Sequence, residues 1–218
     1  MDLNSFSPLS LMNMDLQCAC PLGAALATPT APTCKEDIGE IRRIILQRTL
    51  DGTTLNTIVI GTDDPTLLAT WTALQGAAGN TKIAALATMA EVTPDGGGPR
   101  EAGTGPGGVT LYKGALPTSY SAQFQQIEQD VIRSYRAYQC EPRLSAWLVN
   151  ENDQIIGLKD ATVATTFRGI PLESLYIGPK FTGGLNQVDY NMINWSFLGE
   201  WSDFLHVVTP VFSPLLEL

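Results

Sequence analysis

Short apolar runs separated by turn-forming residues dominate the chain from Ile38 onward. Runs of this length, bounded by Gly, Pro, Asn and Asp, are typical of β-strands. Asp51-Gly52 and the segment 150–153 supply turn chemistry between neighbouring runs. The segments that predict strands are 41–50, 55–60, 82–89, 109–112, 144–149, 154–158, 161–167, 172–177, 187–198 and 204–211.

One longer segment has a helical period. Between Ser121 and about Gln139, apolar side chains recur every three or four residues, which predicts an amphipathic helix packed on a sheet. Glu141-Pro142 would end it, because proline disfavours helical geometry in the preceding residue. The stripe consists of Phe124, Ile127, Val131, Tyr135 and Tyr138. A second, shorter helix is expected from Thr66 to about Leu74, capped by Asp63 and Asp64.

Closely spaced strands with one convincing long helix predict a mainly β (α+β) fold, a β-sandwich or barrel with that helix on its flank. The length of 218 residues suits a single core. We therefore expect one β-rich domain at 37–218, with a helix at about 121–139, preceded by an extended N-terminal arm at 1–36.

Two segments have no regular period. The arm is rich in Pro, Ala, Thr and Leu, and we expect it to be ordered by contact with neighbouring subunits. Residues 94–108 are rich in Gly and Pro and predict a long loop that a partner would hold. Within the loop, 103–108 matches the G-x-G-x-x-G dinucleotide pattern, but a Gly/Pro loop precedes it and a strand-like segment follows, which excludes the fingerprint.

Charge narrows the function. The net charge is −9 and only 16% of residues are charged, below the roughly 25% of typical soluble chains. A surface so poor in charge suits a subunit that is buried against neighbours. The acidic balance argues against specific nucleic-acid binding but fits a channel through which DNA slides without being held.

The sequence predicts neither a signal peptide nor a membrane-spanning helix. The first 34 residues contain no Lys or Arg, and Asp15 interrupts the apolar run there, so no signal peptide is expected. No segment approaches the roughly 18 uninterrupted apolar residues of a membrane helix. Production in the cytoplasm is the expectation.

Candidate chemistry is sparse. Cys18, Cys20 and Cys34 cluster while Cys140 is distant, and metal binding, a disulfide or small buried thiols all remain open, with buried thiols favoured. His206 is the only histidine, so no histidine-based catalytic motif is present. Three carboxylate pairs lie beside turns, where acidic residues serve local structure. These pairs are Asp63 with Asp64, Glu151 with Asp153, and Glu200 with Asp203. We expect no enzyme, and no catalytic, cofactor-binding or metal-binding residues.

Several segments carry a resemblance. Residues 18–23, 41–48, 69–74 and 184–190, together with Trp195 and Trp201, resemble structural proteins of tailed bacteriophages that infect Bacteroidetes. The resemblance spans most of the chain and points to the major tail tube protein. It implies a β-sandwich or barrel flanked by a helix, and arms or loops that link stacked, usually hexameric rings around a DNA channel.

The expected function is thus a virion structural subunit that self-assembles into a tube in the host cytoplasm and resides in the tail. Its partners would be copies of itself, and other tail or connector proteins are further candidates. DNA would pass through the tube without specific binding, and no membrane contact is expected. Another virion part, such as a head–tail connector, a tail terminator or a capsid decoration protein, is the closest alternative. A carbohydrate-binding β-sandwich would instead expose aromatic platforms, for which the candidates are Trp147, Trp195 and Trp201.

Overall fold

The computed structural model describes residues 38–104, 108, 110–159, 166–185 and 188–218. The predicted arm therefore lies outside the described residues. Contacts divide the chain into two compact units, of which the larger comprises 36–98 and 115–218. The described part of the smaller unit is the hairpin β7–β8, which falls within 99–114 except for its last residue.

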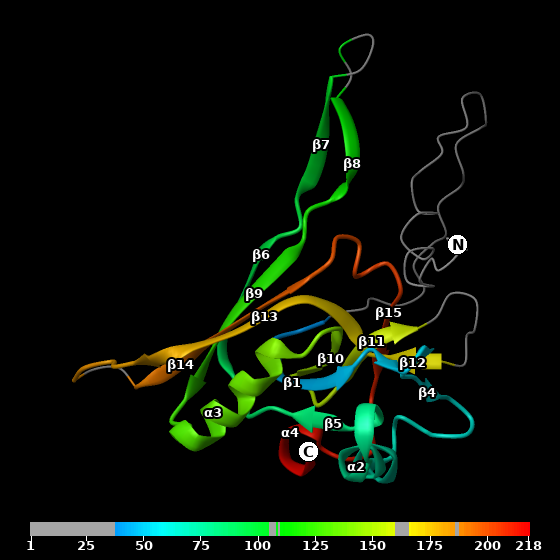
Figure 1. Cartoon of the computed structure of the whole chain (residues 1–218), viewed down its shortest axis with the longest axis vertical. Coiled ribbons are helices and arrows are strands. Elements are labelled where there is room, and N and C mark those ends of the chain that lie inside the picture. Colours follow the sequence, from blue (N-terminus) through cyan, green and yellow to red (C-terminus); the bar gives the residue numbers. More distant parts are fainter. Residues whose placement is uncertain (1–37, 105–107, 109, 160–165, 186–187) are drawn as a thin grey trace, which may run out of the picture. The chain divides into compact units, whose positions relative to one another are not determined.

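The larger unit is mainly β, as predicted (Figure 1). Its strands are β1 (Ile41–Arg48), β2 (Leu50–Asp51), β3 (Thr54–Leu55), β4 (Ile58–Val59), β5 (Ile83–Ala85), β6 (Ala90–Gly96), β9 (Thr118–Gln125), β10 (Leu144–Asn150), β11 (Ile155–Lys159), β12 (Thr166–Arg168), β13 (Ile170–Phe181), β14 (Tyr190–Phe197) and β15 (Leu205–Val208). Its helices are α2 (Leu68–Gly76), η1 (Gly79–Thr81), α3 (Gln129–Arg136), η3 (Ala137–Cys140) and α4 (Pro214–Glu217). The hairpin strands are β7 (Pro99–Thr104) and β8 (Thr110–Ala115).

Eleven of these strands form one antiparallel sheet in which β13 is the bridge between two parts. At its start, β13 pairs with β10 through Ile170 and Pro171, and from Leu172 onward it pairs with β14. The strands around β10 make a central sheet, and β13, β14, β9 and β6 make what we call the outer sheet. The described strands do not close into a barrel.

The core lies on both faces of β10. Alternate side chains of this strand enter two apolar clusters, Ala146 and Leu148 in one, Trp147 and Val149 in the other. The first cluster fills the space that the central sheet, the inner face of the outer sheet and α3 share. The second lies beneath α2 and α4. Burial of both faces explains why the 144–149 segment is an almost unbroken apolar run.

The helix predicted for 121–139 is wrong in its first half. Residues 118–125 are strand β9, which pairs with β14 on one side and β6 on the other, and the helix begins only at Gln129. Tyr120, Ala122 and Phe124 alternate with polar residues and point into the core. The sequence did not reveal this period of two, because Phe124 fits both the alternation of a strand and the three-to-four-residue spacing of a helix. Sheet hydrogen bonds on both edges overrode the helical pattern.

The loop predicted for 94–108 is also wrong for most of its length. β6 extends to Gly96 and β7 runs from Pro99 to Thr104, while 105–107 lie outside the described residues. The glycines do not prevent pairing, since Gly96 and Gly97 use positive φ angles of 91° and 74° that side-chain-bearing residues avoid. Backbone bonds from Gly97 N to Pro117 O (3.1 Å) and from Leu116 N to Gly98 O (2.8 Å) extend the pairing of β6 and β9.

Candidate functional site

In the outer sheet, apolar and polar side chains are divided regularly between the two faces. Its inner face is apolar, and Tyr120 stacks on Trp195 across β9 and β14, with ring centroids 5.2 Å apart. Burial raises the pKa of the Tyr120 phenol. Because side chains alternate along a strand, every residue between these core positions points to the opposite face.

That opposite face, here called the polar face, carries mainly uncharged hydrogen-bonding side chains in rows across the strands, with Asp95 as a charged member at the β6 edge. Strand register aligns Thr93, Ser121, Asn194 and Tyr176 in one row and Asp95, Ser119, Ser196 and Ser174 in the next. Within these rows Thr93 Oγ1 lies 3.1 Å from Ser121 Oγ, and Ser174 Oγ lies 2.6 Å from Ser196 Oγ. The alternation of Ser and Gln in 119–125 is the sequence signal that could have revealed this face.

The β13 edge of the outer sheet is partly open. Arg136 Nε and Gln139 Nε2 donate to Ile177 O at 3.3 Å and 3.1 Å, so this carbonyl points away from β14. Residues two apart on a strand direct their backbone polar groups the same way, so those of Leu175 face the same edge. Beside Leu172–Leu175 lies a groove of about 180 Å³ whose other wall is formed by 138–144.

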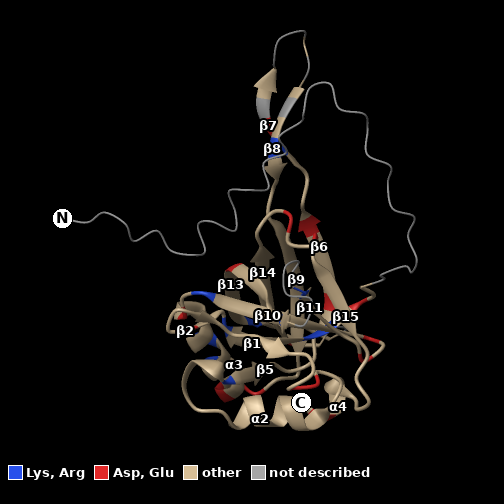
Figure 2. Cartoon of the chain, turned by 90° about the vertical axis from the view of Figure 1, so that its right-hand side faces the viewer, with Lys and Arg blue, Asp and Glu red and all other residues tan. Residues whose placement is uncertain are grey.

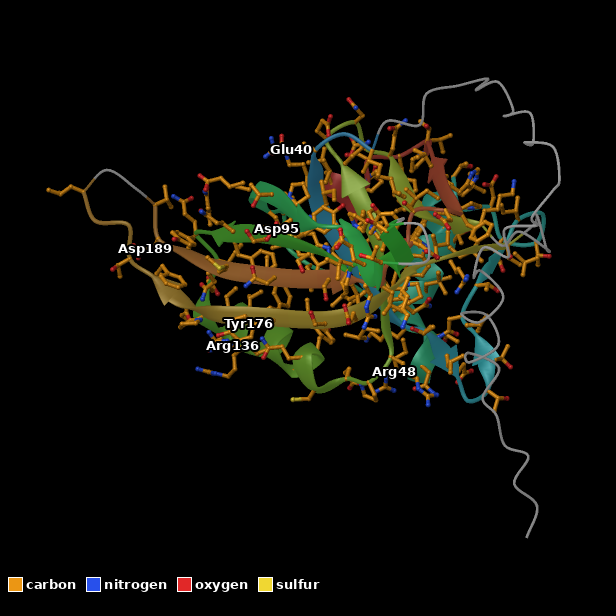
Figure 3. All side chains as sticks on the ribbon, turned by 90° about the horizontal axis from the view of Figure 1, so that it is seen from above. Glu40, Arg48, Asp95, Arg136, Tyr176 and Asp189 are labelled. Atoms are coloured by element: carbon orange, nitrogen blue, oxygen red, sulfur yellow. The ribbon has the colours of Figure 1, made fainter. Side chains whose placement is uncertain are left out.

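The opposite edge is β6, which among the described strands pairs only with β9. A bulge between Ala90 and Thr93, with Glu91 at φ 54°, shortens the regular stretch. Pro94 has no N–H to donate, and Asp95 adds a charge, devices that restrict which strand can add to an edge. In Figure 3, Asp95 lies toward the β6 edge of the outer sheet, and Tyr176 and Arg136 lie toward its β13 edge.

The two edges differ in charge. β6 contributes the exposed carboxylates Glu91 and Asp95, whereas β13 contributes Glu173 and Lys180. Next to β13, Arg136 and the exposed Arg143 add positive charge, and Glu141 is paired with Arg48 (2.6 Å). The β6 edge is therefore the more acidic of the two.

The predicted carboxylate pairs are placed in turns. Asp64 Oδ1 accepts from Thr66 N at 2.9 Å and from its hydroxyl at 2.8 Å, bonds that lower the pKa of this exposed carboxyl. Asp153 Oδ1 accepts from Ser213 Oγ (2.9 Å) and Leu215 N (3.2 Å) and holds the start of α4. Glu200 has φ 64° in the turn before β15. Asp64 and Asp153 therefore have local structural roles.

The cysteines and the histidine are not brought together within the described residues. Cys140 is exposed at the end of η3, which corrects the expectation of a buried thiol there, and Cys18, Cys20 and Cys34 lie outside the described residues. His206 lies opposite Gly157 in β15, with its ring 5.9 Å from that of Phe167. The described part of the chain contains no group of three or more His, Cys, Asp or Glu side chains that could hold a metal ion.

Two of the three candidate glycan platforms are buried. Trp147 and Trp195 are 0% and 1% exposed, and Trp201 is half-buried against Phe197, with ring centroids 4.8 Å apart. The G-x-G-x-x-G segment starts in β7 and is followed by β8, so no helix follows it to receive a pyrophosphate. A strand precedes it, contrary to our expectation of a loop.

A polar cluster at the end of β1 was missed by the sequence reasoning. Arg48 Nε and Nη2 donate to one carboxylate oxygen of Glu141 at 2.9 Å and 2.6 Å, and Nη1 donates to Asn80. Asn56 Nδ2 donates to the backbone carbonyls of Arg48 (2.8 Å) and Asn80 (2.9 Å). These bonds join the end of β1 and Asn56, which follows the β2–β3 hairpin, to η1 and to Glu141 between η3 and β10, which is a structural role.

Of the helices that the structure describes, none is both long and apolar enough to cross a membrane. No protein-family model matches the sequence, and no curated protein sequence is significantly similar to it. One solved structure, titled "Crystal structure of Hcp protein", aligns with 72% of this chain and 89% of its own, at 12% identity and a TM-score of 0.23. A TM-score of 0.23 does not establish a shared fold.

Proposed function

We propose that this chain is a virion structural subunit, the tail tube protein of a bacteriophage, which closes into rings that stack around a DNA channel. The observation that supports this most is the outer sheet, which ends at β6, is partly open along β13 beyond its pairing with β10, and presents a mainly uncharged polar face between these edges. The resemblance of the sequence to phage structural proteins adds the virion setting.

Head-to-tail contact would join the β6 edge of one copy to the β13 edge of the next. Two different edges form a heterologous interface, which produces a ring when the rotation closes. The acidic β6 edge, with Glu91 and Asp95, would face Arg136 and Arg143 of the neighbour. Pro94 has a backbone carbonyl that can accept a hydrogen bond but no N–H to donate one, so only a short stretch of β6 can pair with a neighbouring strand. This restriction favours one defined contact over indiscriminate strand addition.

The polar face would line the channel. DNA is gripped when Lys and Arg replace the counterions of its phosphates. Among the described strands of the outer sheet the one Lys or Arg is Lys180, which pairs with the buried, core-facing Asn191, and its ammonium lies 3.5 Å from Asp189. Hydroxyl and amide side chains remain hydrated and offer no fixed positive charge, so DNA would pass without specific binding.

Negative-stain microscopy of the purified full-length chain tests the proposal directly. Long hollow tubes are the expected result. Isolated rings would indicate the alternative of a connector or terminator, and particles that remain monomeric at high concentration would contradict both.

Charge reversal tests the edges. Asp95→Lys or Arg143→Glu alone should dissociate the rings, because each places like charges at the contact, and the double variant should restore them. Lys159→Glu makes an equal charge change on β11, outside the outer sheet, and serves as the control. Rings that survive both single changes would rule out the β6–β13 contact.

A further inference from the structure

The surface formed by α2 and the C-terminal segment is unusually free of charge. From Pro65 to Thr81 the sequence contains no charged residue, although much of this segment is exposed. The outward side of α2 consists of small or apolar residues, namely Leu67, Ala69, Thr72, Ala73 and Gly76. A surface helix normally shows a charged or polar outer face, and a helix without one is normally buried.

The C-terminal segment extends this surface. Val211 N donates to Thr66 O at 3.0 Å, and Gln75 Nε2 donates to Leu218 O at 3.4 Å, so both ends of α2 are joined to residues 211–218. Figure 2 shows α2 and α4 side by side. Leu67, Val211 and Leu216 are 45%, 78% and 86% exposed. We call residues 66–76 and 211–218 the α2–α4 platform.

The rim of the platform is acidic. Asp63, Asp64 and Glu217 are exposed at its margin. Arg43 donates to Pro214 O of α4 at 2.7 Å, but it is half-buried, and desolvation lowers its pKa. A segment that docks on this platform should therefore combine apolar surface with positive charge.

The β7–β8 hairpin has this combination. It contains Arg100, Lys113 and one carboxylate, Glu101, so its net charge is +1 in a chain whose net charge is −9. Tyr112 is 60% exposed. A two-stranded hairpin is marginally stable in water without a further surface to pack on. We propose that the hairpin of one copy docks on the α2–α4 platform of a second copy, and that this contact joins successive rings.

This inference rests on the proposed function for its place in a tube, but the pairwise contact can be tested without it. A platform variant, Leu67→Glu with Leu216→Glu, keeps the hairpin intact. A hairpin variant, Arg100→Glu with Tyr112→Ser and Lys113→Glu, keeps the platform intact. Leu185→Glu, at a side chain fully exposed elsewhere in the larger unit, is the control for adding an acidic group.

Each full-length variant alone should lose self-association along the stack by at least roughly tenfold, because a hot-spot contact is removed. An equimolar mixture of rings that were assembled separately from the two variants, carrying different tags, retains one intact contact between unlike rings. It should form double rings and no longer stacks, as seen by microscopy and light scattering, whereas the Leu185→Glu chain should form full tubes.

The outcomes separate the two ideas. If the edge contact fails, the mixture still gives a one-to-one pair, and the proposed tube is lost while this inference stands. If rings form but the mixture gives no cross-association, the docking contact is overturned and the ring stands. Platform-variant tubes of normal length, or a wild-type chain that stays monomeric at high concentration, would also overturn it.

Discussion

Glycines at close approaches show how single residues decide the packing of the central sheet. A Cβ atom built at Gly157 would lie 2.6 Å from Arg168 O and 2.7 Å from the Phe167 ring. At Gly76, in the last turn of α2, the same atom would meet nothing within 4 Å. The two glycines therefore have opposite tolerance for a side chain.

Gly157→Ala is expected to destabilise the protein by about 2 to 3 kcal/mol, since backbone and a buried ring must move to admit the methyl group. Gly76→Ala is the matched control and should be neutral or stabilising by up to about 1 kcal/mol, because alanine is the better helix former. Urea unfolding of a monomeric preparation measures both. Equal midpoints for the two variants would contradict the packing argument.

Buried phenols predict a loss of stability at alkaline pH. Burial raises the pKa values of Tyr120 and Tyr135 above the ordinary 10.0. Below pH 10 both phenols are neutral in the folded and unfolded chains, so their contribution is complete there. As the pH rises further the unfolded chain ionises first, and stability falls until the folded phenols ionise.

Tyr135→Phe tests this at one position. Tyr135 Oη accepts from Ala87 N at 3.0 Å, so the variant should lose about 1 kcal/mol at neutral pH. It should also lose part of the alkaline dependence of the unfolding free energy. The measurement is urea unfolding as a function of pH, with tyrosinate absorbance as the ionisation probe, and an unchanged dependence would refute the assignment.

At the scale of elements, side chains from distant parts of the chain fix short segments that are too short to be stable alone. α4 spans only Pro214–Glu217 and carries no side-chain cap at its own N-terminus. Asp153 and Arg43 supply the bonds that fix it from neighbouring turns and strands. The C-terminal half of the platform therefore depends on two residues that are distant in sequence.

Asp153→Ala should cost about 1 to 2 kcal/mol, comparable to the loss of a helix cap, and should speed amide exchange in 213–217. Asp153→Asn keeps the Oδ1 acceptor and tolerates the φ of 58° at this position, so it should remain close to wild type. Hydrogen exchange followed by mass spectrometry distinguishes them. Matching exchange in the two variants would mean that the carboxylate does not hold α4.

At the scale of the whole molecule, the hairpin and the larger unit are separate compact units. The bonds of Gly97 and Gly98 to Pro117 and Leu116 complete the β6–β9 pairing before the hairpin begins. The larger unit should therefore fold without the hairpin.

Replacing residues 100–114 by Asn-Gly should leave the melting temperature within a few degrees and abolish tubes while leaving rings. Circular dichroism and microscopy check the two parts of this expectation. A chain that fails to fold would show that the hairpin is required by the larger unit.

The N-terminal arm gives a related prediction from its sequence. Deleting residues 2–17 removes most of the large apolar side chains of the arm, its Leu, Met and Phe residues. The deletion should weaken assembly more than folding, because contacts with a neighbouring copy offset the entropy that the arm loses on ordering. Sedimentation analysis and thermal unfolding of the shortened chain measure the two effects. A larger loss of folding stability than of assembly would indicate that the arm packs on its own domain.

Local patterns in the sequence were sufficient for the mainly β class, for β1 and β10 and for the turn at 150–153, because apolar runs and turn residues act over a few neighbours. They were insufficient for β9, where Phe124 fits two periods, and for β6 and β7, where glycine concealed pairing. Only the tertiary structure decided that β13 joins the two parts of the sheet, that Asp153 holds α4, and that the polar face lies between the β6 edge and the partly open β13 edge. The physical reason is that strand pairing and long-range hydrogen bonds join residues far apart in the chain, and their partners leave no local pattern.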